Sequence, residues 1–71
     1  MTYDESPADY RRGRTTNEML FEAGEIDNFD AAARARNAKR MTAALVRSGV
    51  PQSEAEKITA TTLESPETYG F

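Results

Sequence analysis

Two pairs of neighbouring carboxylates are the residues in this chain whose types and spacing could do acid–base chemistry. Asp27 and Asp30 form one pair, and Glu54 and Glu56 form the other. Paired carboxylates act as general acid and base when a pocket removes water from one of them. Both pairs also lie where a helix is predicted to begin, and acidic side chains stabilise the first turn of a helix. We therefore assign both pairs to helix capping and first-turn electrostatics.

The composition excludes most other catalytic chemistry. The 71 residues contain no His and no Cys, so Ser–His and Cys–His nucleophiles, His-ligated metals and thiolate zinc sites are excluded. The four glycines are isolated and form no phosphate-binding loop. Only ten residues are Leu, Ile, Val or Phe, which is too few to build a deep desolvating pocket. The sequence predicts a protein that is not an enzyme and that uses no metal or cofactor.

The charges fall into blocks that the net charge of -3 conceals. Residues 15–30 contain five acids and no base, whereas residues 31–50 contain five bases and no acid. The blocks could lie on neighbouring helices and neutralise each other. Alternatively, the basic block could be a binding face for phosphate or for an acidic protein. Mutual neutralisation is the favoured interpretation.

A capping box marks the start of the first predicted helix. Thr15 is followed three residues later by Glu18, and Gly24 is typical of the residue just after a helix. These signals predict a short helix over about 16–23. Residues 1–14 mix proline, glycine and charged residues without a helical period, so they are predicted to form an extended arm.

The strongest helical signal predicts one long helix over about 28–48. Asp27 or Asn28 would cap its start, Gly49 follows its end, and its alanine-rich interior favours helix. Because residues spaced four and three apart share one face, the helix would carry a seam of mostly small side chains that needs a packed neighbour. The seam consists of Ala31, Ala35, Ala38, Thr42 and Leu45.

A second capping box, Ser53 with Glu56, predicts a third helix over about 54–64, which ends before the following proline. Residues 66–71 are predicted to be a C-terminal tail. The fold class is therefore all-α: a small helical bundle or hairpin, with one helical domain over 15–65 and extended N- and C-terminal arms.

The segment RSGVPQSEAEKI resembles the turn and second helix of a DNA-reading helix-turn-helix, with Gly49 at the turn and Val50 beneath it. The resemblance implies that the helix over 54–64 enters the major groove with its first residues on base edges. That leading end carries Glu54 and Glu56 and a single lysine, whereas affinity for DNA needs several basic contacts to phosphate. The helix predicted before the turn is also longer than the first helix of that motif.

A basic ridge offers nucleic acid a second contact. Arg36, Arg40 and Arg47 lie within about 40° of one another on the long predicted helix, opposite the seam. Together with the YRRGR segment of the arm, they could hold a phosphate backbone and stack on bases. The sequence pI is about 4.8, whereas nucleic-acid-binding domains usually have a basic pI. A small nucleic-acid-binding regulator is therefore the alternative hypothesis.

The leading hypothesis is a protein that acts by binding another protein and not by catalysis. Its thin core, its seam and its aromatic arms predict a non-catalytic interaction, structural or regulatory subunit that docks on a larger protein assembly, and a homo-oligomer is compatible with the same features. Small phage-encoded virion components and inhibitors of host factors have this size and composition. No apolar run is long enough for a signal peptide or a membrane span, so we expect a cytoplasmic protein, free or in a particle assembled there. Because aromatic and arginine side chains dominate interface hot spots, the predicted partner contacts are Tyr3, Tyr10, Arg11, Arg12, Arg36, Arg40, Tyr69 and Phe71.

Overall fold

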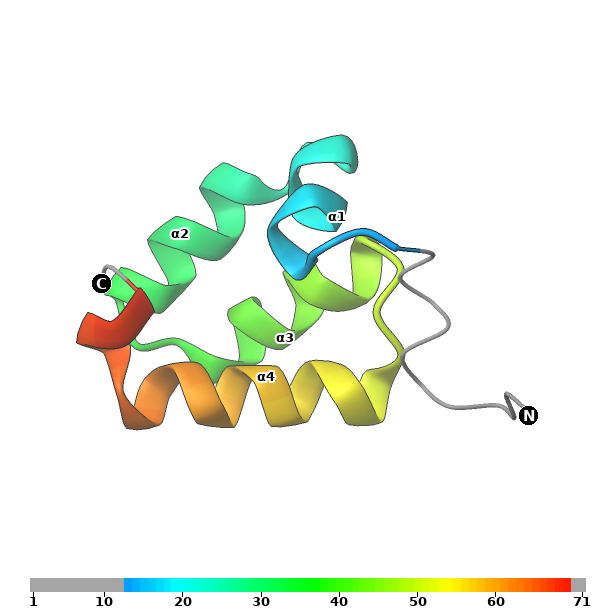
Figure 1. Cartoon of the computed structure of the whole chain (residues 1–71). Helices are drawn as coiled ribbons and strands as arrows, with labels where there is room; N and C mark the ends of the chain where they lie inside the picture. The colour runs from blue at the N-terminus through cyan, green and yellow to red at the C-terminus, as the bar shows by residue number, and fades with distance from the viewer. Residues whose placement is uncertain (1–12, 70–71) are drawn as a thin grey trace.

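A computed structural model describes residues 13–69 of the chain (Figure 1). The described residues form four α-helices and one turn of 3-10 helix, and they contain no strand, which confirms the predicted all-α class. The elements are α1 (Thr16–Glu22), α2 (Ile26–Arg34), α3 (Ala38–Arg47), α4 (Gln52–Glu64) and η2 (Pro66–Tyr69). The predicted arm over residues 1–14 lies almost entirely outside the described residues, as do residues 70 and 71 of the predicted tail.

The start and the end of α1 follow the sequence signals. The backbone N–H of Glu18 donates to Thr15 Oγ1 at 3.1 Å, and the N–H of Thr15 donates to Glu18 Oε1 at 2.9 Å, so the predicted capping box is confirmed. Gly24 has a φ of +72°, and the N–H of Glu25 bonds to the carbonyl of Leu20 at 2.8 Å. This is the Schellman pattern, in which a left-handed residue closes the helix.

The prediction of one helix over 28–48 is wrong, because the chain breaks between α2 and α3. Arg36 has a φ of +57°, and the N–H of Asn37 bonds to the carbonyl of Ala32 at 2.8 Å. Asn37 then caps α3 by accepting a hydrogen bond from the N–H of Arg40 at 3.1 Å. A left-handed arginine costs about 1–2 kcal/mol. The new cap and the packing of α3 back against α2 offset this cost.

The break also overturns the predicted cap and the predicted seam. Neither Asp27 nor Asn28 caps α2, which begins after Glu25 without a side-chain cap bond. With two separate helices in place of one, the five seam residues no longer share a face: three alanines are exposed, Thr42 is half-buried and only Leu45 is buried. The exposed alanines are Ala31, Ala35 and Ala38.

α4 begins two residues earlier than predicted. Pro51 precedes its first residue, and no side chain caps the start, so the capping box of Ser53 and Glu56 is not formed. The fixed φ of a proline suits a helix start, and the carbonyl of Pro51 accepts from the N–H of Ala55 at 2.8 Å. Helical spacing places Ala55, Ile58, Thr62 and Leu63 on one side of this helix. Ala55 and Thr62 are buried, Ile58 and Leu63 are half-buried, and Thr59 is buried as well.

The core forms where α3 packs against both α2 and α4. Figure 1 shows α3 between those two helices, with α1 lying across one end. Met41, Ala44 and Leu45 of α3 are fully buried. Thr42 and Thr59 join α3 to α4 by a hydrogen bond of 2.9 Å between their hydroxyls. Within residues 13–69, none of the helices has both the length and the apolarity needed to cross a lipid bilayer.

Candidate binding groove

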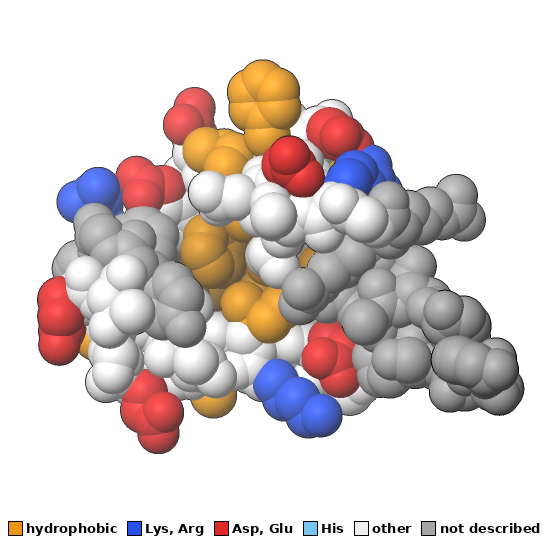
Figure 2. Space-filling model, viewed as in Figure 1, with side chains coloured by type: hydrophobic (Ala, Val, Ile, Leu, Met, Phe, Trp, Pro, Cys, Tyr) orange, Lys and Arg blue, Asp and Glu red, His pale blue; other side chains and the backbone are white. Residues whose placement is uncertain are grey.

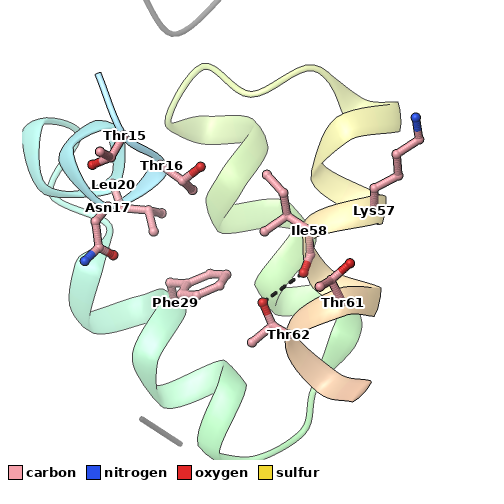
Figure 3. Close-up of a pocket in the computed structure, with 9 residues that line it drawn as sticks. All are labelled: Thr15, Thr16, Asn17, Leu20, Phe29, Lys57, Ile58, Thr61 and Thr62. Atoms are coloured by element: carbon pink, nitrogen blue, oxygen red, sulfur yellow. Dashed lines mark hydrogen bonds between the residues drawn. The ribbon is translucent and has the colours of Figure 1, made fainter. Parts of the chain in front are cut away.

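A groove with a cavity volume of about 480 Å³ opens between α1 and α2 on one side and α4 on the other. Its bottom is apolar, and each of the three helices contributes one side chain: Leu20 from α1, Phe29 from α2 and Ile58 from α4 (Figure 3). Leu20 and Phe29 are buried, whereas Ile58 is half-buried. The remaining lining is polar and consists of Thr15, Thr16, Asn17, Lys57, Thr61 and Thr62.

The groove results from the way the helices pack. α2 and α4 both pack against α3 rather than closely against each other, so a gap remains between them. α1 has only seven residues and covers one end of that gap. Figure 2 shows the result as a hollow with apolar side chains at its bottom and polar side chains around it. A helical domain with few large apolar residues lacks the side-chain volume to fill such a gap.

The threonines of the groove fall into two groups. The hydroxyl of Thr62 donates to the carbonyl of Ile58 at 2.8 Å, and Thr15 caps α1, so both are satisfied within the chain. In contrast, the side chains of Thr16, Asn17 and Thr61 have no hydrogen-bond partner among the residues that the structure describes. These side chains can therefore donate to or accept from a bound molecule.

Lys57 is the one charged residue among those that line the groove. Figure 3 shows its ammonium group pointing away from Phe29 and Ile58, so it is the aliphatic stem that contributes to the lining. The Nζ atom lies 3.5 Å from Glu54 Oε2, and the side chain is 74% exposed. Such a long, solvent-exposed contact holds the lysine weakly.

Phe21 adds an apolar side chain next to the groove. The Phe21 side chain is 75% exposed, although phenylalanine is usually buried and the chain has only three phenylalanines for its core. Asn17 lines both the groove and a shallow depression beside Phe21, so the two features are neighbours on α1. Arg14 and Glu22 form an ion pair that borders the same depression.

Of the predicted contact residues whose side chains the structure describes, Arg36 and Arg40 do not line the groove. Arg36 lies at the α2–α3 junction, where its Nη1 donates to the carbonyl of Ala33 at 2.8 Å. Arg40 is exposed in the first turn of α3 and, with Arg47, lines a different pocket between α2 and α3. Tyr69 belongs to η2. The other predicted contacts lie outside the described residues and are Tyr3, Tyr10, Arg11, Arg12 and Phe71.

The predicted ridge of three arginines is wrong, because Arg36 is not part of a helix and cannot share a helical face with Arg40 and Arg47. Ion pairs also neutralise part of the basic block. Arg47 binds Glu25 through two hydrogen bonds of 2.9 and 3.0 Å, and Arg34 pairs with Asp30 at 3.1 Å. These pairs link the acidic block to the basic block, as the favoured interpretation expects.

Three of the four paired carboxylates make polar contacts in the described part of the chain, and Asp27 lies in the first turn of α2. Arg34 binds Asp30, Lys57 contacts Glu54, and Gln52 donates to Glu56 at 2.8 Å. Among the described residues, the carboxyl group with a clearly shifted pKa is Glu25, where the hydrogen bond from Arg47 and then that from Asn28 lower the pKa from 4.5 to about 2. Within residues 13–69, no three acidic side chains are grouped so that they could hold a metal ion.

The turn between α3 and α4 has the form that the helix-turn-helix resemblance implies. Gly49 has a φ of +104°, and Val50 is buried beneath the turn. Because α3 has ten residues, the argument that the preceding helix is too long no longer applies. The electrostatic argument stands, since Glu54 and Glu56 occupy the start of α4.

The groove and the outward position of Phe21 are the features that sequence reasoning missed. Met19, Leu20 and Phe21 are consecutive, and three consecutive residues of a helix cannot all face one side. Met19 and Leu20 are buried, so Phe21 faces outward. That spacing was a usable signal for Phe21. No sequence signal indicated the groove, because the groove depends on the break at Arg36 and on how α2 and α4 are then placed.

Comparison with known proteins returned no similarity: no family model, no curated protein and no solved structure matches this chain.

Proposed function

We propose that this protein is a non-catalytic docking protein that binds a partner protein through the α1–α2–α4 groove and the adjacent Phe21. The observation that carries the proposal is the placement of a half-buried Ile58 and a 75% exposed Phe21 on either side of Asn17. Exposed apolar side chains raise the free energy of the protein in water, and a partner that covers them lowers it. Covering Ile58 and Phe21 would therefore favour binding at this surface.

The groove has the composition of a protein-binding patch. Apolar side chains occupy its centre and hydroxyl and amide groups surround them, which is how interfaces are divided into a core and a rim. Thr16, Asn17 and Thr61 supply rim groups that have no side-chain hydrogen-bond partner among the described residues, so binding need not break a hydrogen bond within that part of the chain. These properties support docking without any structural change in the helices.

A non-catalytic role agrees with the chemistry of the groove. Among the described residues, no histidine or carboxylate lines the groove, and Lys57 directs its ammonium group away from the groove bottom. We place the partner in a larger assembly, with the chain as a structural or regulatory subunit. A phage-type accessory protein, acting in the cytoplasm or in a particle assembled there, is the form of this role that we propose.

A pair of tryptophan substitutions tests the proposal. Thr61 lines the groove, whereas Ala60 is exposed on the same helix and does not line it. Thr61→Trp should fill the mouth of the groove, and Ala60→Trp should add the same side chain elsewhere. The tagged chain is incubated with an extract of its own cells, and the recovered proteins are quantified. We expect one stoichiometric partner with wild type and Ala60→Trp, and at least tenfold less with Thr61→Trp.

Equal recovery with both variants would exclude the groove as the docking surface. Recovery of no stoichiometric partner by wild type would also contradict the proposal. Circular dichroism and thermal unfolding should give closely similar results for the two variants, because both positions are exposed. A fold defect in Thr61→Trp alone would move the test to Asn17→Trp, which obstructs the groove from α1.

Nucleic-acid binding is the second candidate, favoured by the ten-residue α3 and the turn at Gly49. The contact would be made by the start of α4 or by the exposed Arg40 with Arg36. Retention on duplex DNA should then fall steeply with salt and be lost in Arg36→Ala combined with Arg40→Ala. No retention at low salt would exclude this candidate.

A further inference from the structure

The connection between α2 and α3 is a strained stretch in an otherwise helical sequence. Residues 35–37 join the two helices, and Arg36 lies there with a φ of +57°, a conformation that arginine rarely adopts. Residues 26–47 contain no glycine and no proline, and their alanine content favours helix throughout. The connection therefore holds residues 35–37 against the local preference of the chain.

The contacts that hold this closed arrangement lie between α2 and α3, which run back alongside each other as a hairpin in Figure 1. Phe29 of α2 belongs to the same buried core as Leu45 of α3. Glu25 and Arg47 join the two helices at the end opposite the connection. If the connection became helical, residues 26–47 would form one straight helix about 33 Å long, in which α2 and α3 cannot touch. Each of these contacts would then need a partner from elsewhere.

A second open copy of the chain supplies that partner. Its α2 and α3 carry the same surfaces, so α2 of each copy packs against α3 of the other, and Glu25 of each copy binds Arg47 of the other. Two closed monomers and one such dimer differ mainly in the connection. The dimer removes the left-handed Arg36 from both copies and replaces it with helical hydrogen bonds, which offsets the loss of freedom on association. Short connections under strain favour this kind of exchange.

We propose that the protein forms a dimer by exchanging α3 and α4 between two copies, with α2 and α3 of each copy joined into one helix. The partner in this inference is a second copy of the chain, so the inference goes beyond the proposed docking function and does not depend on it. The exchange also rebuilds the groove from two chains, because Leu20 and Phe29 come from one copy and Ile58 from the other. Each dimer carries two such grooves.

A pair of charge reversals distinguishes this exchange from other modes of association. Glu25→Arg alone, or Arg47→Glu alone, sets like charges against each other in the closed monomer and in the exchanged homodimer. A mixed dimer of the two variants pairs the introduced side chains with each other and the native Glu25 with the native Arg47. The variants are mixed in urea, refolded and analysed by native mass spectrometry. We expect at least tenfold more mixed dimer than either homodimer.

Asp30→Arg and Arg34→Glu provide the matched control. Asp30 and Arg34 also form an ion pair, at 3.1 Å, but both belong to α2 and therefore stay in one copy in either arrangement. Mixing these two variants cannot restore the pair. The mixed dimer should therefore exceed each homodimer only by the statistical factor of two.

Substitutions in the connection test the strain separately from the ion pair. Arg36→Gly removes the cost of the left-handed conformation and disfavours a continuous helix, so it should raise the Kd of the dimer at least tenfold. Asn37→Ala removes the hydrogen bond that caps α3 and favours helix, so it should lower the Kd at least threefold. Ala60→Gly weakens α4, which both arrangements contain, and should leave the Kd unchanged. Light scattering over a range of chain concentrations measures the Kd.

The inference is overturned if the wild-type chain remains monomeric up to its solubility limit, or if the charge-reversal mixture gives only the statistical proportion of mixed dimer. It is also overturned if Arg36→Gly dimerises as tightly as wild type. If the charge-reversal variants do not fold, the comparison of Arg36→Gly with Asn37→Ala decides the question. None of these outcomes bears on docking, because the closed monomer already carries the complete groove and Thr61→Trp tests the groove separately.

Discussion

Arg47 binds both carboxylate oxygens of Glu25 through Nε and Nη2 of its guanidinium group and thereby joins the last turn of α3 to the residue before α2. The Nε–Oε2 distance is 3.0 Å and the Nη2–Oε1 distance is 2.9 Å. The Glu25 side chain is 14% exposed, although that of Arg47 is 53% exposed. Because the two residues are 22 positions apart, this bond depends on the chain reversal at Arg36. It is a direct signature of two helices in place of one.

This ion pair predicts a specific dependence of stability on pH. The hydrogen bonds from Arg47 and Asn28 lower the pKa of Glu25 from 4.5 to about 2 in the folded chain. A lowered folded-state pKa contributes stability that is present above 4.5 and is lost as the pH falls toward 2. Glu25→Gln should therefore lower the urea midpoint at neutral pH and flatten its decrease over that range. Glu64→Gln is the matched control and should leave the profile unchanged. A Glu25→Gln profile that coincides with wild type would contradict the bond.

The left-handed residue at the α2–α3 break predicts opposite effects for two identical substitutions. Arg36→Gly should stabilise the protein by about 0.5 kcal/mol, because glycine adopts a φ of +57° without the steric cost of about 1–2 kcal/mol. The lost hydrogen bond to Ala33 offsets part of that gain. Arg34→Gly, at the last residue of α2, should destabilise the protein, because glycine is the poorer helix former and the ion pair with Asp30 is lost. Urea unfolding of the two variants measures both changes in the free energy of unfolding. If Arg36→Gly costs as much as Arg34→Gly, the chain has no break there.

The hydroxyl pair between α3 and α4 predicts a non-additive mutant cycle. Thr59→Val should cost about 1 kcal/mol, because it leaves the hydroxyl of Thr42 without its partner at 2.9 Å. Thr42→Val should do the same to the buried Thr59. The double variant removes both hydroxyls, so its free energy of unfolding should lie close to that of wild type. Purely additive losses would show that the two residues do not interact.

Local signals in the sequence were sufficient for much of the fold. The capping box of Thr15 and Glu18 involves residues one turn apart, so its pattern determines the start of α1 without help from the rest of the chain. Gly24 and Gly49 likewise mark the ends of α1 and α3 through their positive φ. The inward side of α4 follows from helical spacing.

The break at Arg36 and Asn37 could not be read in the same way. Alanine-rich sequence on both sides favours a continuous helix, and arginine gives no sign of a left-handed conformation. The gain that outweighs this preference is tertiary: Met41 and Leu45 become buried when α3 turns back against α2. The groove depends on the same reversal, so its lining residues could be identified as helical but not as neighbours.

The most direct test of docking through the groove is photocrosslinking from two positions of the full chain. Benzoylphenylalanine replaces Asn17, which lines the groove, or Lys39, which lines a separate pocket between α3 and α4. The chain is illuminated in an extract of its own cells, with excess unlabelled wild type or Thr61→Trp as competitor. The account predicts one discrete protein adduct from position 17 that wild type suppresses and Thr61→Trp does not, and no such adduct from position 39. Equal adducts from both positions, or equal suppression by both competitors, would contradict it.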